Sequence, residues 1–276
     1  MIDLRKHAIA LHFVKPGDAV IDAGAFIGSY SFLYRKMVGS RGLVFAYEAQ
    51  PRAADMFKAK VQTKKIRNII VREKAVSSTN GEKLAMKVYA DKMEQSCTVE
   101  PLLMNEERMP GNTIVVKVET EKLDTLKNRL GGRALSFIKI DTEGHESQVI
   151  EGAAELIVQH QPFIVMEYGF IPGSFEPTTL FQLQELGYTC FDLRTMQKVL
   201  PGYVSLLPTD LVGVPKTQVE VFLQFFSSLP SNPILLKGIV YYTFLKTWIR
   251  TLLEFCFETV RKKGQTFPQC NDRSDP

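Results

Sequence analysis

Paired cysteines and a strong charge imbalance are both missing from this sequence of 276 residues. Its four cysteines lie far apart and form no Cys-x-x-Cys pair, which argues against a zinc site or disulfide scaffold and favours a reducing compartment. Lysine and arginine number 34 against 30 acidic residues, so the net charge of +4 does not by itself indicate nucleic-acid binding.

Long apolar runs and targeting signals are also missing. The first residues carry charges where a signal peptide has its apolar core, and no Asn-x-Ser/Thr acceptor occurs. The most apolar stretch, near the C-terminus, is interrupted by Lys237, Lys246 and Arg250, so it falls short of the ~18 uninterrupted apolar residues of a spanning helix. These absences favour a cytoplasmic protein.

What the sequence does contain is a regular alternation of strand-like and helix-like segments. Buried strands are predicted at 19–23, 43–47, 69–76, 135–140 and 163–166, and later strands at 188–193 and 205–214. Helices are predicted at 29–37, 51–64, 146–160 and 178–186. Strands that alternate with helices predict an α/β fold with a mostly parallel sheet and right-handed crossovers.

A change of composition near residue 217 predicts an appendage to this domain. Residues 1–216 would form the main domain, 217–264 a helical extension and 265–276 a disordered tail. The extension, through 232–264, could pack on the domain or on a second subunit as a homodimer contact, which is the favoured alternative, or it could lie on a membrane surface. The polar segment 91–112 is either a lid or a solvated insertion.

The first chemical motif is the strand and turn from Val20 to Gly28, with Asp22 in the strand and Gly24 directly after it. Glycines are needed where a ligand approaches the backbone closely. Phe26 stands where the dinucleotide fingerprint G-x-G-x-x-G requires its second glycine. The acidic Asp22 would repel a pyrophosphate, but it favours a cationic ligand such as S-adenosylmethionine.

Two further acidic positions follow predicted strands. Glu48 comes directly after strand 43–47, where a carboxylate can accept both hydroxyls of a ribose. Strand 135–140 is followed by Asp141, and five ionisable groups lie between Lys139 and Glu146. His145 is a plausible general base, while Glu143 and Glu146 could instead stabilise a helix N-terminus.

The residues from about 12 to 215 resemble the FkbM family of S-adenosylmethionine-dependent methyltransferases. The resemblance rests on residues 20–25 with Gly28, on Glu48 with Pro51, on the segments 75–77, 123–124 and 210–215, and above all on 138–146. It implies a class I methyltransferase fold, with a mostly parallel seven-stranded sheet, one antiparallel strand and helices on both faces. It implies O-methylation of a sugar, glycoconjugate or small metabolite.

The resemblance also implies which residues carry these roles. Cofactor-binding positions would be Asp22, Gly24, Ala25, Phe26, Gly28, Glu48, Ala49, Ala75, Val76 and Asp141, and catalytic positions Asp141, His145, Glu143 and Lys139. The family commonly has asparagine at the position of Phe26 and proline at that of Ala49, so Phe26 is expected to narrow or reshape the pocket.

The mechanism has two versions. In the favoured metal-free version His145 or Asp141 acts as the base, and in the other Asp141 and Glu167 hold Mg²⁺ or Mn²⁺. Two alternative functions stay open as well: a nucleic-acid methyltransferase, with a basic patch between Arg52 and Lys74, and a non-catalytic scaffold.

Overall fold

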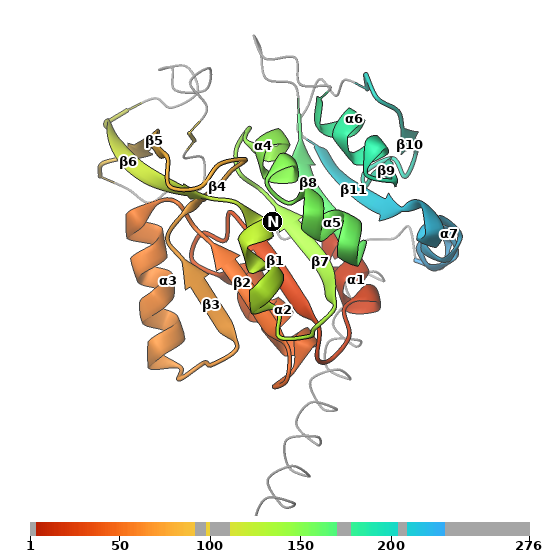
Figure 1. Cartoon of the computed structure of the whole chain (residues 1–276), viewed down its shortest axis with the longest axis horizontal. Helices are drawn as coiled ribbons and strands as arrows, with labels where there is room; N and C mark the ends of the chain where they lie inside the picture. The colour runs from red at the N-terminus through yellow and green to blue at the C-terminus, as the bar shows by residue number, and fades with distance from the viewer. Residues whose placement is uncertain (1–3, 92–97, 100–110, 170–177, 204–208, 230–276) are drawn as a thin grey trace, which may run out of the picture.

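The computed structural model describes residues 4–91, 98–99, 111–169, 178–203 and 209–229 (Figure 1). Most of the segment 91–112, most of the predicted helical extension and the whole predicted tail lie outside these residues. The possible homodimer or membrane contact through 232–264 also lies outside them.

The main sheet has eight strands in the order β10-β9-β11-β8-β7-β1-β2-β3. Their bounds are β1 (Ala19–Ala23), β2 (Leu43–Tyr47), β3 (Ile69–Arg72), β7 (Leu135–Ile140), β8 (Phe163–Tyr168), β9 (Tyr188–Asp192), β10 (Lys198–Val199) and β11 (Thr209–Pro215). The five strands from β8 to β3 are parallel, and β11 runs antiparallel to both its neighbours. The predicted α/β fold is therefore confirmed.

The predicted number of seven strands needs one correction. The eighth strand, β10, is a two-residue edge that pairs Lys198 with Phe191 and Val199 with Cys190. Two residues are too few to show an alternating pattern, so only the pairing with β9 defines this strand.

Helices cover both faces of the main sheet. Their bounds are α1 (Leu4–Phe13), α2 (Ser29–Val38), α3 (Pro51–Thr63), α4 (Glu146–Glu151), α5 (Ala154–His160), α6 (Thr178–Glu185) and α7 (Val219–Ser227), with 3-10 turns η2 (Leu123–Arg129) and η3 (Lys216–Gln218). The apolar sides of α4, α5, α6 and η2 pack on one face, and those of α1, α2, α3 and α7 pack on the other. Strands covered on both sides explain why the apolar runs of β1 and β7 are nearly continuous.

A second, smaller sheet has the order β4-β6-β5 and lies beyond α3 at one end of the molecule (Figure 1). Its strands are β4 (Ala75–Val76), β5 (Lys83–Tyr89) and β6 (Thr113–Glu121). The prediction of one strand over 69–76 is thus wrong. The chain leaves the main sheet after Arg72, and Ala75 and Val76 pair with Thr120 and Glu121 of β6.

The prediction of a single helix over 146–160 is also wrong, because this segment forms two helices, α4 and α5. Gly152 ends α4, and α5 begins two residues later. The carboxylate of Asp124, in η2, accepts the backbone N–H of Leu156 at 2.9 Å and that of Glu155 at 3.3 Å. A side chain distant in sequence therefore satisfies the free donors of the first turn of α5, which stabilises a new helix start inside a continuous apolar pattern.

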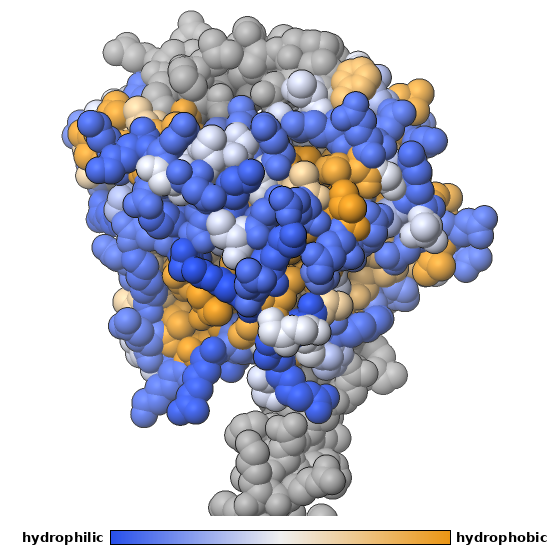
Figure 2. Space-filling view, viewed as in Figure 1, coloured by the Kyte–Doolittle hydropathy of each residue, from blue (hydrophilic) through white to orange (hydrophobic). Residues whose placement is uncertain are grey.

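The beginning of the predicted extension packs on the main domain. Phe222 of α7 is 0% exposed and contacts the rings of Phe163 and Phe191. The face of the molecule in Figure 2 is largely hydrophilic, with apolar residues in separate groups. Within the described residues, none of the helices has the length and apolar character needed to cross a membrane.

Candidate functional site

A cavity of about 300 Å³ lies at the carboxyl ends of β1, β2 and β7. It is lined by most of the positions that the sequence singles out: Gly24, Ala25, Phe26, Glu48, Ala49, Ala75, Val76, Lys139, Asp141, Glu143 and His145. Three other predicted positions, Asp22, Gly28 and Glu167, do not line it. Parallel strands present their carboxyl ends at one edge, which is where open α/β sheets bind ligands.

The turn after β1 depends on glycine at Gly24, for a reason that the sequence did not reveal. Gly24 has a φ of +75°, and a Cβ there would lie only 1.7 Å from the backbone oxygen of Asp141. Glycine is thus required for the close packing of this turn against the end of β7, besides any ligand in the cavity. The N–H groups of Gly24 and Ala25 both donate to the carbonyl of Tyr47, which joins the turn to β2.

Glu48 is held firmly at the end of β2. Its carboxylate oxygens accept the backbone N–H of Phe26 at 2.6 Å and that of Gln50 at 2.8 Å. Burial raises the pKa of Glu48 above its ordinary value, and these two hydrogen bonds oppose that rise. Since each carboxylate oxygen has a second lone pair, Glu48 can still accept hydrogen bonds from a ligand.

Phe26 has a backbone conformation that is uncommon for its residue type. Its φ is +50°, in the left-handed region that asparagine adopts more readily than phenylalanine. This conformation aims its N–H at Glu48, and its side chain lines the cavity. Phe26 is therefore one of the residues that shape the cavity.

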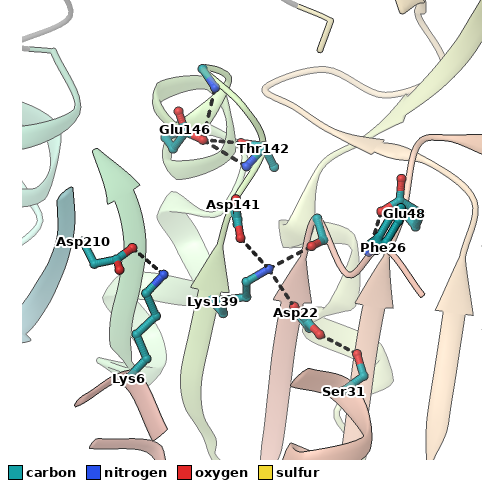
Figure 3. A network of polar contacts seen from close by, with 12 residues as sticks. Lys6, Asp22, Phe26, Ser31, Glu48, Lys139, Asp141, Thr142, Glu146 and Asp210 are labelled. Carbon is teal, nitrogen blue, oxygen red and sulfur yellow. Dashed lines mark hydrogen bonds and ion pairs between the residues drawn. The ribbon is translucent and has the colours of Figure 1, made fainter. Parts of the chain in front are cut away.

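Lys139 lies at the centre of a buried polar network (Figure 3). Its Nζ donates to the carbonyl of Gly24 at 2.8 Å and lies 3.2 Å from Asp141 Oδ2 and 3.4 Å from Asp22 Oδ1. Burial disfavours the charge on Lys139, but the two carboxylates outweigh it and raise the pKa of the ammonium. Asp22 is 0% exposed and also accepts the hydroxyl of Ser31 at 2.5 Å.

Three carboxyl groups gather beside this network. Oxygen atoms of Asp141, Glu143 and Glu167 lie within 4.8 Å of one another. Burial disfavours the charge on Asp141, but Lys139 and then Lys6 outweigh it and hold its pKa below the ordinary value. At the other two carboxyls such compensation is absent, as for Glu167, or too small, as for Glu143 beside Lys139. Burial and the charge of Asp141 raise the pKa of Glu143 to about 7 and that of Glu167 well above its ordinary range.

His145 and Glu146, next along the chain, have different surroundings. His145 lines the cavity, yet it is only 7% exposed and its Nε2 lies 3.0 Å from the hydroxyl of Ser77. The carboxylate of Glu146 accepts the N–H and the hydroxyl of Thr142, each at 3.0 Å. Glu146 thus closes the turn before α4, in agreement with its interpretation as a helix-start residue.

The structure adds cavity residues that the sequence did not single out, among them Lys6, Tyr30, Tyr47 and Met86. Lys6 comes from α1 and pairs with Asp210 of β11, so it reaches the site only because the first helix packs on one face of the sheet. No local pattern marks such a residue. Tyr47, in contrast, is the last residue of β2 and directly precedes Glu48, so its place in the strand could have indicated it.

The reversed strand β11 beside β8 and the cavity at the carboxyl edge of β1 define a class I methyltransferase fold. A sequence model described as "Methyltransferase FkbM domain" matches residues 22–190. The chain belongs to the FkbM methyltransferase family, as its motifs predicted. No curated protein matches the sequence.

Solved structures that match part of this chain include two methyltransferases. The methyltransferase FkbM from Methylobacillus flagellatus KT is 14% identical, with a TM-score of 0.41 over 71% of this chain and 43% of that one. A SAM-dependent O-methyltransferase from Thermotoga maritima is 15% identical, with a TM-score of 0.41 over 77% of this chain and 64% of that one. This chain thus spans less than half the length of the Methylobacillus protein.

Proposed function

We propose that this protein transfers the methyl group of S-adenosylmethionine to a hydroxyl of a sugar, glycoconjugate or small metabolite. The observation that carries the proposal is the placement of two acidic residues around one glycine turn. Glu48 follows β2 and Asp141 follows β7, the two strands that flank β1, and both side chains line the same cavity.

The residues present fit such a cofactor. Glu48 has free lone pairs for the two ribose hydroxyls, and Asp141 offers a carboxylate to a cationic group. The cavity wall also contains the apolar side chains of Ala49, Ala75 and Val76, which suit an aromatic base. When bound, the cofactor supplies an electrophilic methyl on a sulfonium, so the protein has to orient the acceptor oxygen and remove its proton.

Three side chains in the cavity could take that proton. His145 and Asp141 are the bases that the sequence predicted, and the pKa of about 7 makes Glu143 a third. The contact between His145 and Ser77 orients the imidazole ring. His145→Ala is expected to lose activity while it retains cofactor affinity. Full activity in that variant would eliminate His145 as the base and leave the two carboxylates.

The cheapest test of the whole proposal is calorimetry of the full chain with S-adenosylhomocysteine. Binding is expected, and its absence would favour the alternative of a non-catalytic scaffold. Incubation with isotope-labelled cofactor and a panel of sugars, followed by mass spectrometry, then tests the acceptor class. Labelled oligonucleotides in the same assay test the nucleic-acid alternative.

Three of the eight basic residues from Arg52 to Lys74 already pair with carboxylates, which lowers the charge that this segment offers to a nucleic acid. Between Arg52 and Lys74, the side chains of Lys58, Arg72 and Lys74 pair with Glu73, Glu121 and Glu119 respectively. Cations already neutralised by carboxylates contribute less to binding phosphates.

We favour the metal-free reaction, with a divalent cation as the alternative. The close carboxylate oxygens of Asp141, Glu143 and Glu167 suit Mg²⁺ or Mn²⁺, but acidic groups are also common without an ion. Activity is expected to be unchanged after EDTA treatment and gel filtration. A loss that is restored by added Mg²⁺ or Mn²⁺ would establish the metal-dependent version.

A further inference from the structure

We propose that the amino edge of the main sheet is a docking surface for an anionic membrane. This inference goes beyond the proposed function and does not depend on it. Four segments directly precede the parallel strands β1, β2, β3 and β7, so they lie together at this edge of the sheet (Figure 1). They are residues 14–18, 35–42, 64–68 and 129–134, and together they are called the basic edge.

The basic edge has a charge imbalance that the net charge of the whole chain does not show. Its segments contain nine basic residues against one acidic residue, Asp18, so its formal net charge is +8. The whole chain has a net charge of +4, which leaves −4 for all other residues. Six of the nine basic residues are exposed and the other three are half-buried. A surface of this charge attracts anionic partners.

Hydrogen bonds between the segments show that they adjoin. The side-chain amide of Asn68 donates to the carbonyl of Gly39 at 2.7 Å, and the Nε of Arg133 donates to the carbonyl of Arg41 at 2.7 Å. A backbone hydrogen bond of 2.8 Å joins the first segment to the second. The positive charges of the four segments therefore gather on one surface.

The ends of helices explain only part of this charge. Basic residues near a helix C-terminus offset the partial negative charge of its last carbonyls. Arg35 and Lys36 lie in the last turn of α2, and Lys64 is the C-cap residue of α3. Arg41 and Arg67 come after these helix ends and are exposed, so helix stability does not account for them.

The position of α7 favours a membrane over a nucleic acid as the partner. The ring of Phe225 in α7 stacks on that of His12 at 4.1 Å, two residues before the basic edge begins. The described chain ends four residues after Phe225, and the sequence that follows, 230–276, combines apolar residues with Trp248 and the basic run 261–263. Apolar residues beside a basic surface supply the two attractions that hold a protein on an anionic bilayer, whereas a nucleic acid uses mainly the charge.

Docking through the basic edge leaves the candidate site open to solvent. The cavity lies at the carboxyl ends of β1, β2 and β7, which is the opposite edge of the same sheet. Acidic residues line that cavity, among them Glu48 and Asp141. The two opposite edges thus differ in the sign of their charged residues, and this difference turns the basic edge toward an anionic surface.

Flotation of the full chain with lipid vesicles tests the proposal. We expect binding to vesicles of phosphatidylcholine mixed with phosphatidylserine, and none to vesicles of phosphatidylcholine alone. Binding should weaken as the ionic strength rises from about 0.1 M to about 0.5 M, because salt screens exposed charges. In the triple variant Lys64→Gln, Lys65→Gln and Arg67→Gln, the partition coefficient should fall about a hundredfold.

The matched control removes three exposed lysines that lie outside the basic edge, Lys83→Gln, Lys117→Gln and Lys198→Gln, and it should bind the vesicles like the wild type. A second variant from two other segments, Arg41→Gln with Arg129→Gln, should lower the partition coefficient about thirtyfold, and it replaces the triple variant if that one does not fold. Thermal unfolding checks the fold of each variant.

Three results overturn the proposal. The first is a wild-type chain that does not bind the anionic vesicles. The second is equal binding by the wild type and the folded variants, which assigns the attraction to residues outside the basic edge. The third is tighter binding of an oligonucleotide than of vesicles, lost in the same variants, which makes a nucleic acid the partner. Calorimetry with S-adenosylhomocysteine probes the opposite edge, so it tests the proposed function separately.

Discussion

Among single residues, Glu143 has a largely buried carboxyl group with no direct polar partner among the residues that the structure describes. It lines the cavity, and within the described part of the chain its carboxylate takes part in no hydrogen bond or ion pair. Burial, Asp141 and Glu146 together raise its pKa to about 7. A carboxyl group that lines a cavity and has a pKa near neutrality is a candidate for proton transfer.

Glu143→Gln is expected to stabilise the folded protein at high pH. Because the folded pKa lies above the unfolded one, the unfolded chain loses its proton first, and stability falls as pH rises from about 4.5 through about 7. Glutamine removes that loss, so the free energy of unfolding at pH 8 should rise by roughly 1–3 kcal/mol. Urea unfolding at pH 5 and pH 8 measures the difference, and an equal effect at both values would contradict it.

Glu48→Gln is expected to weaken cofactor binding. The carboxylate accepts N–H groups of Phe26 and Gln50 on its two oxygens, and a glutamine amide can accept only one of them. The unsatisfied N–H costs about 1–3 kcal/mol of stability, and affinity for S-adenosylhomocysteine should fall about tenfold. Calorimetry measures the affinity, with the exposed Glu73→Gln as control. Unchanged affinity would remove Glu48 from the cofactor site.

Among the elements, helix α7 shows how the C-terminal part begins. Phe222 is buried among rings of Phe13, Phe163 and Phe191 from α1, β8 and β9, so this helix belongs to the packed domain. The domain boundary predicted after residue 216 thus falls just before a helix that packs on the main sheet and on α1. The alternatives for 232–264 lie outside the described residues and stay predictions.

Phe222→Ala is expected to lower the free energy of unfolding by about 3–5 kcal/mol, because it leaves a cavity in a close-packed aromatic cluster. Leu223→Ala is the matched control, since Leu223 is the next residue of the same helix and is 44% exposed. Its effect should stay within about 0.5 kcal/mol. Chemical unfolding of both variants measures the difference, and similar values would contradict the packing of α7.

Helix and strand boundaries show where local patterns were insufficient. The apolar spacing of 146–160 is continuous, so it predicts one helix, yet Asp124 and Gly152 divide it. The apolar run of 69–76 predicts one strand, yet Val76 pairs with β6, a strand of the second sheet. In both places a partner distant in sequence decides the boundary.

At the scale of the whole molecule, the candidate site joins segments from across the chain. Lys6, Glu48, Met86 and Asp141 come from α1, the end of β2, β5 and the end of β7, and all line one cavity. These elements separate when the chain unfolds, so the cavity exists only in the folded state. A ligand that fills it should therefore stabilise the folded state.

S-adenosylhomocysteine is therefore expected to raise the melting temperature of the full chain. At about 100 times its dissociation constant, binding adds about 2.7 kcal/mol to the free energy of unfolding. A thermal-shift titration measures this, with Glu48→Gln as the variant in which the shift shrinks at equal ligand concentration. No shift at saturating ligand would contradict a site built from these elements.

The amino-acid sequence by itself determined the strand–helix order, the family and the acidic residues after β2 and β7. These properties depend on apolar periodicity and on short motifs, which are local. Only the tertiary structure decided that Asp22 faces Lys139 and Ser31, that Lys6 reaches the cavity and that Glu143 and Glu167 share the surroundings of Asp141. The contact between Lys139 and Gly24 joins residues 115 positions apart. Which carboxylate a buried cation neutralises depends on such long-range packing. Local sequence patterns do not predict these contacts.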